Sequence, residues 1–126
     1  METIQQYKAK LTYAFGLMRK AGLVARQNFA CCGSCGSYEL HKIVKEMHAD
    51  ARANVKGVAF YHRQDTFHMR QKSFEGLYIG YGQEGSEDEL AANIEVGQTI
   101  AMCLRDAGLT VDWDGDTTKR IWAGRS

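Results

Sequence analysis

Two helical patterns in this sequence end in the same way, and this repeated ending most constrains the fold. Residues 18–23 (MRKAGL) and 104–109 (LRDAGL) each combine the end of an amphipathic pattern, a glycine and an apolar residue. A glycine after the last turn adopts the left-handed conformation that commonly ends a helix. The apolar residues that follow predict entry into a strand. The chain is therefore predicted to contain two helix-to-strand units.

The segments around these two units predict the other elements. We expect helices over about residues 4–20, 38–53 and 86–107, the second capped by Ser37 and the third by a capping box of Ser86 and Glu89. Strand patterns cover residues 23–29, 58–62, 76–82, 109–113 and 120–123, and the last two form a hairpin. The polar segment between the second and third strands, residues 63–75, is expected to be a long loop.

This order of elements predicts an α+β fold. Strands grouped in pairs between helices are typical of a two-layer sandwich, with about three helices packed on one face of a mainly antiparallel sheet of four to five strands. A length of 126 residues and a hydrophobic fraction of 44% fit a single domain over residues 1–126.

Composition argues against two classes of partner. Sixteen basic and fifteen acidic side chains give a net charge of +1, so no global field attracts nucleic acid or a membrane surface. No apolar stretch approaches the roughly 20 residues of a membrane span, and the amphipathic N-terminus does not have the pattern of a signal peptide. We therefore expect a cytoplasmic location.

The chemistry of the chain is concentrated in the segment Cys31-Cys32-Gly33-Ser34-Cys35-Gly36. Two thiolates separated by two residues bind one tetrahedral zinc ion when the backbone turns tightly, as glycines permit. Clustered thiols outside a secreted protein favour metal or redox chemistry over structural disulfides. Cys32 and Cys35 are the primary predicted ligands. A reactive thiol pair before a helix and inert buried cysteines are the alternatives.

A complete zinc site needs ligands from outside the C-x-x-C pair. His62 is the first candidate, because it ends a strand at the start of a polar segment, and Cys31 is the second, although neighbouring side chains tend to diverge. The other candidates are His41, His48, His68 and Cys103. A catalytic interpretation makes His62 a base oriented by Asp65, with Cys32 as a nucleophile; ordinary solvent exposure at a strand end is the simpler interpretation.

Two further patterns are assigned to turns. Gly80–Gly85 fits the G-x-G-x-x-G spacing, but nearby acidic residues would repel a phosphate and the chain is too short for a full dinucleotide-binding domain. Asp112, Asp114 and Asp116 alternate as in a calcium loop, but the twelfth-position glutamate is absent, so we expect a hairpin turn.

Several motifs together resemble a family of small bacterial proteins and domains of unknown function. These are the N-F-x-C-C-x-x-C motif at Asn28–Cys35, the H-x-Q-D-T motif at His62–Thr66 and the C-terminal W-D-G hairpin at Trp113–Gly115. The resemblance spans most of the chain after about residue 18, and it groups Cys31, Cys32, Cys35, His62, Gln64 and Asp65 as one set. It departs at Phe67, where the family pattern places an acidic residue. The family implies no established activity.

Three functions are compatible with these features. The first is a zinc-binding module that binds or regulates another protein. The second is an enzyme that uses Cys31, Cys32 or Cys35 with His62 and Asp65, through a thiol or an open zinc site. The third is a small inhibitor or accessory protein, for instance a phage-borne one. Without a catalytic signature such as G-x-S-x-G or H-E-x-x-H, the sequence leans away from an enzyme.

Overall fold

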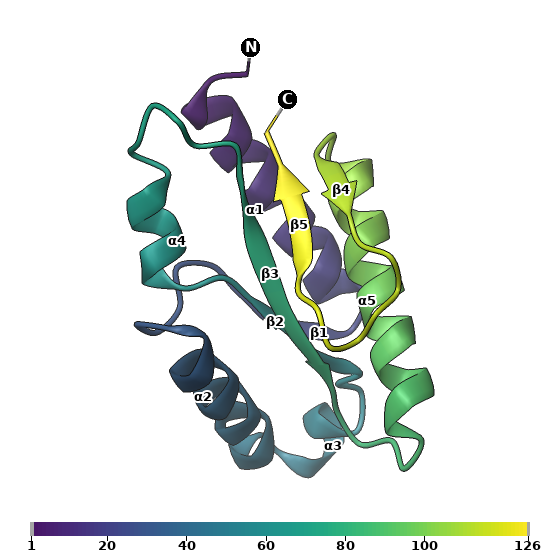
Figure 1. Ribbon diagram of the computed structural model, residues 1–126. Coiled ribbons are helices and arrows are strands. Elements are labelled where there is room, and N and C mark those ends of the chain that lie inside the picture. The colour runs from purple at the N-terminus through teal and green to yellow at the C-terminus, as the bar shows by residue number, and fades with distance from the viewer. Residues whose placement is uncertain (1, 126) are drawn as a thin grey trace.

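A computed structural model describes residues 2–125 and shows an α+β protein built on one open, five-stranded mixed sheet. The strands are β1 (Leu23–Arg26), β2 (Gly57–Phe60), β3 (Gly76–Gln83), β4 (Thr110–Asp112) and β5 (Ile121–Gly124). Their spatial order is β1-β2-β3-β5-β4. The helices are α1 (Ile4–Lys20), α2 (Gly33–Glu46), α3 (Ala49–Arg52), α4 (Arg63–His68) and α5 (Glu89–Asp106) (Figure 1).

The sheet is antiparallel except at one edge. β2 pairs with β3, β3 with β5 and β5 with β4 in antiparallel fashion, whereas β1 and β2 are parallel. A parallel pair needs a crossover connection, and the segment that holds α2 and α3 supplies it. The expectation of a mainly antiparallel sheet is therefore correct for three of the four strand pairs, and the parallel pair is a feature that the sequence patterns did not predict.

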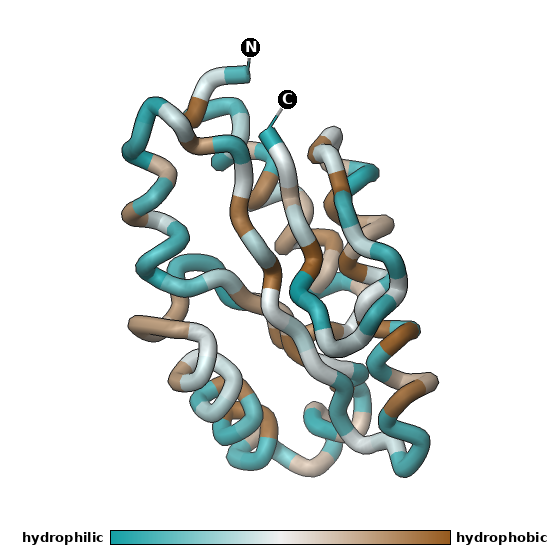
Figure 2. Tube along the Cα trace, in the orientation of Figure 1, coloured by the Kyte–Doolittle hydropathy of each residue, from teal (hydrophilic) through white to brown (hydrophobic). Residues whose placement is uncertain are grey.

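Helices cover both faces of the sheet, which corrects the expected arrangement of helices on one face. Side chains alternate across the pleat, so Leu23, Ala25 and Ala59 join a core with α1 and α5. The intervening residues Val24, Val58 and Phe60 pack with Leu40 and Val44 of α2 in a second, smaller core. Figure 1 shows α2 and α5 on opposite sides of the sheet, and in Figure 2 hydrophobic residues alternate with others along β3.

The two predicted helix ends are confirmed. α1 ends at Lys20 and α5 at Asp106, and the glycines that follow, Gly22 and Gly108, have φ angles of 96° and 90°. Only glycine adopts this left-handed region without steric cost. Each glycine leads within two residues into a strand of the sheet, as the repeated pattern predicted.

Helix starts differ from the expectations. α2 begins at Gly33 with Cys32 as its N-cap, five residues before the expected start after Ser37. Its early start is possible because Gly36 lets the first turn lie against the ring of Phe60, where a Cβ would come within 2.3 Å of a ring carbon. The chain leaves the helical conformation at Met47, so a separate short helix, α3, follows.

The polar segment 63–75 is not wholly a loop, because α4 occupies its first half. His62 is the N-cap of α4, and the Asp65 carboxylate accepts a hydrogen bond of 3.1 Å from the His62 backbone amide. The third expected helix also starts differently: Asp88, rather than Ser86, caps α5 by accepting from the amide of Ala91. No helix within residues 2–125 is long and apolar enough to cross a membrane.

Candidate metal centre

The candidate site lies at the edge of the sheet where the parallel strands β1 and β2 end. Each strand leads directly to a helix N-terminus: β1 to α2, capped by Cys32, and β2 to α4, capped by His62. The carboxyl ends of parallel strands are a common position for binding sites. Two predicted site residues thus cap neighbouring helices at one edge, although they lie thirty residues apart in the sequence.

The chain between β1 and Cys31 is held in a tight turn. Asn28 and Ala30 have positive φ angles of 51° and 63°. A left-handed alanine carries a steric cost of about 1 kcal/mol. Backbone hydrogen bonds stabilise the turn: the Phe29 amide donates to the Tyr61 carbonyl at 2.9 Å, and the Arg63 amide donates to the Ala30 carbonyl at 3.1 Å. These bonds anchor the segment that precedes the cysteines to the one that contains His62.

Three cysteine sulfurs come together at this turn. The Sγ atoms of Cys31, Cys32 and Cys35 all lie within 4.8 Å of one another, and those of Cys31 and Cys32 are 3.9 Å apart. Two sulfurs on one tetrahedral zinc ion, each at about 2.3 Å from the metal, are separated by about 3.8 Å. Cys31 therefore joins the group despite the expected divergence of neighbouring side chains. Cys31 and Cys35 are exposed and Cys32 is half-buried, so an ion has access.

The three thiols have different electrostatic surroundings. The backbone amide of Cys35, followed by the thiols of Cys35 and Cys31, lowers the pKa of Cys32 from its ordinary value. The N-cap position explains this effect, because the first amides of a helix stabilise negative charge. In contrast, the neighbouring thiols of Cys31 and Cys32 raise the pKa of Cys35 to about 11. Cys32 thus becomes a thiolate more readily than Cys35, and the thiolate is the form that binds metals and acts as a nucleophile.

His62 lies outside the three-sulfur group. It is 8% exposed, and its Nδ1 is 3.4 Å from Oδ2 of Asp65 without a well-formed hydrogen bond. The Asp65 carboxylate, in the first turn of α4, instead accepts a hydrogen bond from the backbone amide of His62. Gln64 lies in the first turn of α4 and is exposed.

The remaining candidate ligands lie elsewhere. His41 of α2 pairs with Glu84 at the end of β3. His48 caps α3, and His68 ends α4. Cys103 is a residue of α5 that faces the core, where it is 7% exposed, and burial raises the pKa of its thiol. Among residues 2–125, only the three clustered cysteines form a group of three or more such ligands.

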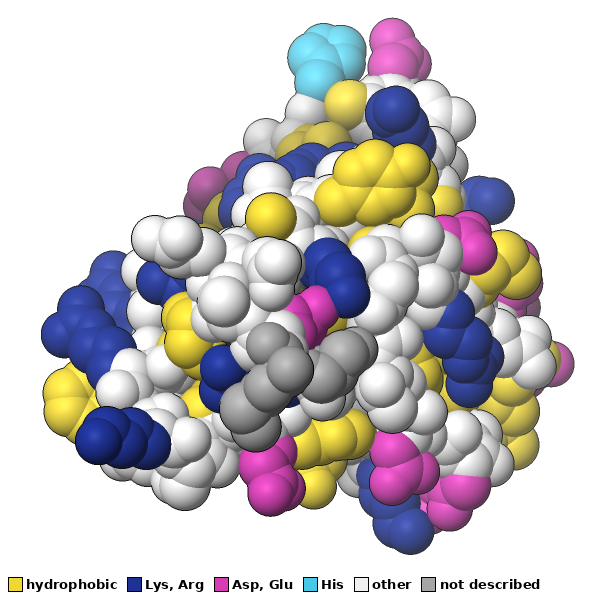
Figure 3. Space-filling model, turned by 90° about the horizontal axis from the view of Figure 1, so that it is seen from above, with side chains coloured by type: hydrophobic (Ala, Val, Ile, Leu, Met, Phe, Trp, Pro, Cys, Tyr) yellow, Lys and Arg dark blue, Asp and Glu magenta, His cyan; other side chains and the backbone are white. Residues whose placement is uncertain are grey.

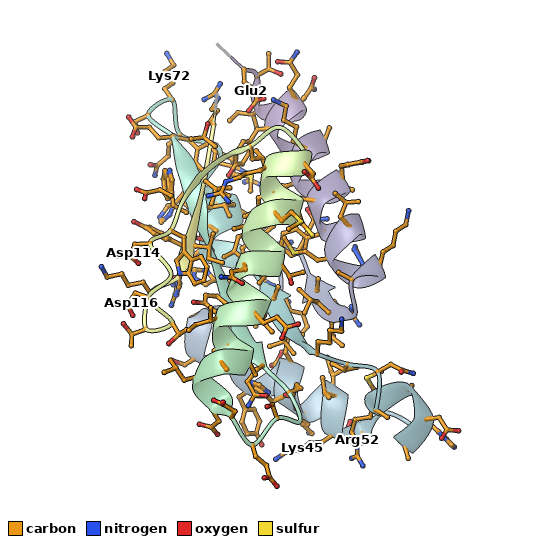
Figure 4. All side chains as sticks on the ribbon, turned by 90° about the vertical axis from the view of Figure 1, so that its right-hand side faces the viewer. Glu2, Lys45, Arg52, Lys72, Asp114 and Asp116 are labelled. Carbon is orange, nitrogen blue, oxygen red and sulfur yellow. The ribbon has the colours of Figure 1, made fainter. Side chains whose placement is uncertain are left out.

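Arg120 is the residue near this site that the sequence did not indicate. It immediately precedes β5, and its guanidinium lies over the first turn of α2, where a Cβ on Gly33 would come within 2.5 Å of Nη2. The acidic loop before it is a turn, as expected: the Asp116 carboxylate accepts from the Thr118 amide and hydroxyl, and Gly115 has a φ of 90°. Asp114 and Asp116 project from this loop, away from α5 (Figure 4).

The face of the molecule seen from above carries charges of both signs. The space-filling view from above shows basic side chains gathered at its left edge, while basic, acidic and hydrophobic side chains alternate over the rest of that face (Figure 3). Both signs of charge on this face agree with the near-zero net charge.

Fold and site together define a small α+β protein with an exposed group of three thiols that could hold a metal ion. The chain belongs to the family described as "Domain of unknown function (DUF6891)", whose model matches residues 5–125. This match confirms the predicted grouping with small domains of unknown function. No curated protein and no solved structure matches the chain.

Proposed function

We propose that this protein is a zinc-binding module in which Cys31, Cys32 and Cys35 provide three ligands. The observation that carries the proposal is the grouping of three sulfurs within 4.8 Å on a five-residue segment. Thiolates select zinc and other soft metals over magnesium and calcium. The lowered pKa of Cys32 favours binding, because a ligand must lose its proton before it coordinates.

His62 is the proposed fourth ligand. Its segment is hydrogen-bonded to the turn before the cysteines, and its Nδ1 faces a carboxylate. Zinc-binding histidines usually present one ring nitrogen to the metal and the other to a carboxylate or carbonyl. In this arrangement Nε2 binds the ion and Asp65 orients the ring, which requires the His62 side chain to approach the sulfurs.

Metal content of freshly purified protein tests this function. We expect about one zinc ion per chain, lost in Cys32→Ser and retained in the matched control Cys103→Ser. His62→Ala should weaken binding, whereas His41→Ala should not. A protein that contains no metal, takes up none when zinc is supplied and is unchanged by chelators would contradict the proposal.

Thiol–disulfide chemistry at Cys32 and Cys35 is the second candidate function. It is favoured by a C-x-x-C pair whose first cysteine caps a helix and has a lowered pKa, while the second has a raised one. This combination activates the first thiol as a nucleophile. It predicts a Cys32–Cys35 disulfide on mild oxidation and rapid exchange with a small disulfide. If neither occurs in the zinc-free protein, this candidate fails.

The expected protein partner and cytoplasmic location stay predictions. A module of this kind would present the zinc-ordered loop to its partner, so we propose that partner binding depends on the metal. Chelation would then release the partner along with the ion.

A further inference from the structure

A hollow of about 580 Å³ lies beside the cysteine group, between the first turns of α2 and the connection from β4 to β5. Phe60 and Gly80 are part of its lining, and a Cβ on Gly80 would lie 3.0 Å from the Phe60 ring. The polar residues around it include Ser34, Ser37, Tyr38, Thr117, Lys119 and Arg120. The three clustered cysteines do not line this hollow, so it is separate from the candidate metal centre.

The hollow is positively charged. Lys119 and Arg120 are the charged residues of its lining, and no carboxylate is part of that lining. Lys119 forms an ion pair with Asp114, in which Nζ lies 3.5 Å from Oδ2, and both side chains are largely exposed. The Arg120 guanidinium has no ion pair or hydrogen bond with any of residues 2–125. Arg120 is therefore the cation available to a ligand.

Neutral donors surround this cation. The hydroxyls of Ser34, Ser37 and Tyr38 have no hydrogen-bond partner within the described chain, and all three come from the first two turns of α2. The amides of Ser34 and Cys35 interact instead with the Cys32 sulfur. Ligand binding in the hollow thus relies on side chains, and the helix end itself is already used by Cys32.

Gly33 makes this arrangement possible. A Cβ at this position would come within 2.5 Å of Arg120 Nη2, so the glycine allows the guanidinium to lie against the first turn of α2, whose hydroxyls line the same hollow. A planar guanidinium beside several hydroxyl donors is well suited to a tetrahedral oxyanion, which accepts many hydrogen bonds.

We propose that this hollow is an oxyanion-binding site that takes a phosphate group, with Arg120 as its main cation and Ser34, Ser37 and Tyr38 as donors. The proposal goes beyond the metal function and does not depend on it.

A second hollow beside the first bears on whether the ligand is free phosphate or a phosphate ester. It has a volume of about 510 Å³, shares Lys119 and Arg120 with the first, and contains the exposed ring of Tyr78 beside Trp122. Asp112 and Asp114 also line it, so this second hollow suits the uncharged aromatic part of a ligand, and the phosphate belongs in the first hollow. The two rings are in edge-to-face contact at 5.0 Å. A phosphate ester with an aromatic group would use both hollows, whereas free phosphate would use only the first.

Titrations with inorganic phosphate and with phenyl phosphate, followed by amide chemical shifts, test the proposal. We expect saturable shifts at Ser34, Ser37 and Thr117 with both probes. Tighter binding of phenyl phosphate with shifts at Tyr78 identifies an ester as the source, and equal affinity identifies free phosphate. Arg120→Gln should weaken binding about tenfold or more, as expected for the loss of charge-assisted hydrogen bonds.

Arg105→Gln is the matched control, because Arg105 is an exposed arginine on α5, across the sheet from the hollow. It should bind both probes like the unchanged protein, and so should Cys32→Ser without metal, which separates this site from the metal function. Non-saturable shifts that sodium chloride reproduces at equal ionic strength would overturn the proposal. Full binding in Arg120→Gln would overturn it as well.

Discussion

Three cysteines within five residues are not equivalent, and their differences come from backbone position. Cys32 caps α2, where the amide of Cys35 lowers its pKa, while Cys35 lies inside the first turn and has its pKa raised to about 11 by its neighbours. Sequence spacing predicts that these residues act together. It does not predict which of them loses its proton first, because that depends on which cysteine is the N-cap.

The first prediction concerns the order of thiol reactivity. In reduced, zinc-free protein a lowered pKa leaves more thiolate at neutral pH, and a raised pKa leaves less, so Cys32 should alkylate faster than Cys35. Buried Cys103, whose pKa is also raised, should react slowest. Rates of iodoacetamide labelling against pH, read by mass spectrometry, measure this order.

The variant Cys35→Ser gives the control for that experiment. Its backbone amide remains, and that amide is the largest cause of the lowered pKa at Cys32. Cys32 should therefore keep most of its reactivity at neutral pH. If Cys32 instead titrates as an ordinary free cysteine in both proteins, the account of its environment is wrong.

The sequence did not indicate Arg120, a residue that reaches the site only in the folded chain. Arg120 lies far from the cysteines along the chain and reaches α2 only because β5 is a central strand and Gly33 leaves room for the guanidinium. The isolated arginine carries no motif. Its only sequence signal is its position beside Lys119 at the start of a predicted strand.

At the scale of elements, α2 shows how packing can decide where a helix begins. The pattern favoured a start after Ser37, yet the helix extends back to Gly33 and its first turn rests on Phe60. Helix propensity disfavours glycine, so the sequence alone argued against this start. Close approach to the sheet outweighs that cost and places Cys32 at the helix end.

The second prediction tests this contact with a matched pair of glycine substitutions. Gly36→Ala should lower the free energy of unfolding by about 1–3 kcal/mol, the usual cost of overpacking, because its Cβ would lie 2.3 Å from the Phe60 ring. Gly16→Ala in α1 meets nothing within 4 Å and should gain up to about 1 kcal/mol from helix propensity. Urea denaturation of both variants measures the contrast. Equal effects would contradict the packing account.

At the scale of the whole molecule, the two ends of the chain are joined. The Tyr7 hydroxyl of α1 donates a buried hydrogen bond of 2.6 Å to the Ala123 carbonyl of β5. Nearby, the Arg125 guanidinium donates to the Glu2 and Phe74 carbonyls. These bonds hold the first helix to a central strand of the sheet, so loosening them should affect the stability of the entire fold.

The third prediction follows from the hydroxyl of Tyr7. Tyr7→Phe leaves the buried Ala123 carbonyl without this donor and should cost about 1–3 kcal/mol. Tyr13→Phe on the same helix removes a hydroxyl from a side chain that is 61% exposed and should change little. Thermal and urea unfolding of both variants measure the difference. An equal cost for the two substitutions would show that the buried bond does not stabilise the fold.

The fold class was predictable because local patterns determine it: amphipathic helices, glycine helix ends and the final hairpin were all visible. Layering was not. α2 lies across the sheet from α1 and α5 because β1 and β2 are parallel, and strand direction has no local signature. The same crossover places Cys32 and His62 at one edge, so their proximity was a hypothesis that only the three-dimensional arrangement could address.

The most direct measurement of the central claim is zinc X-ray absorption spectroscopy on the purified, zinc-loaded protein. The account predicts three sulfur ligands at about 2.3 Å and one nitrogen or oxygen ligand at about 2.0–2.1 Å. Cys31→Ser should reduce the sulfur count to two, while Cys103→Ser should leave it at three. A shell without sulfur, or one unchanged by loss of Cys31, would contradict the three-cysteine centre.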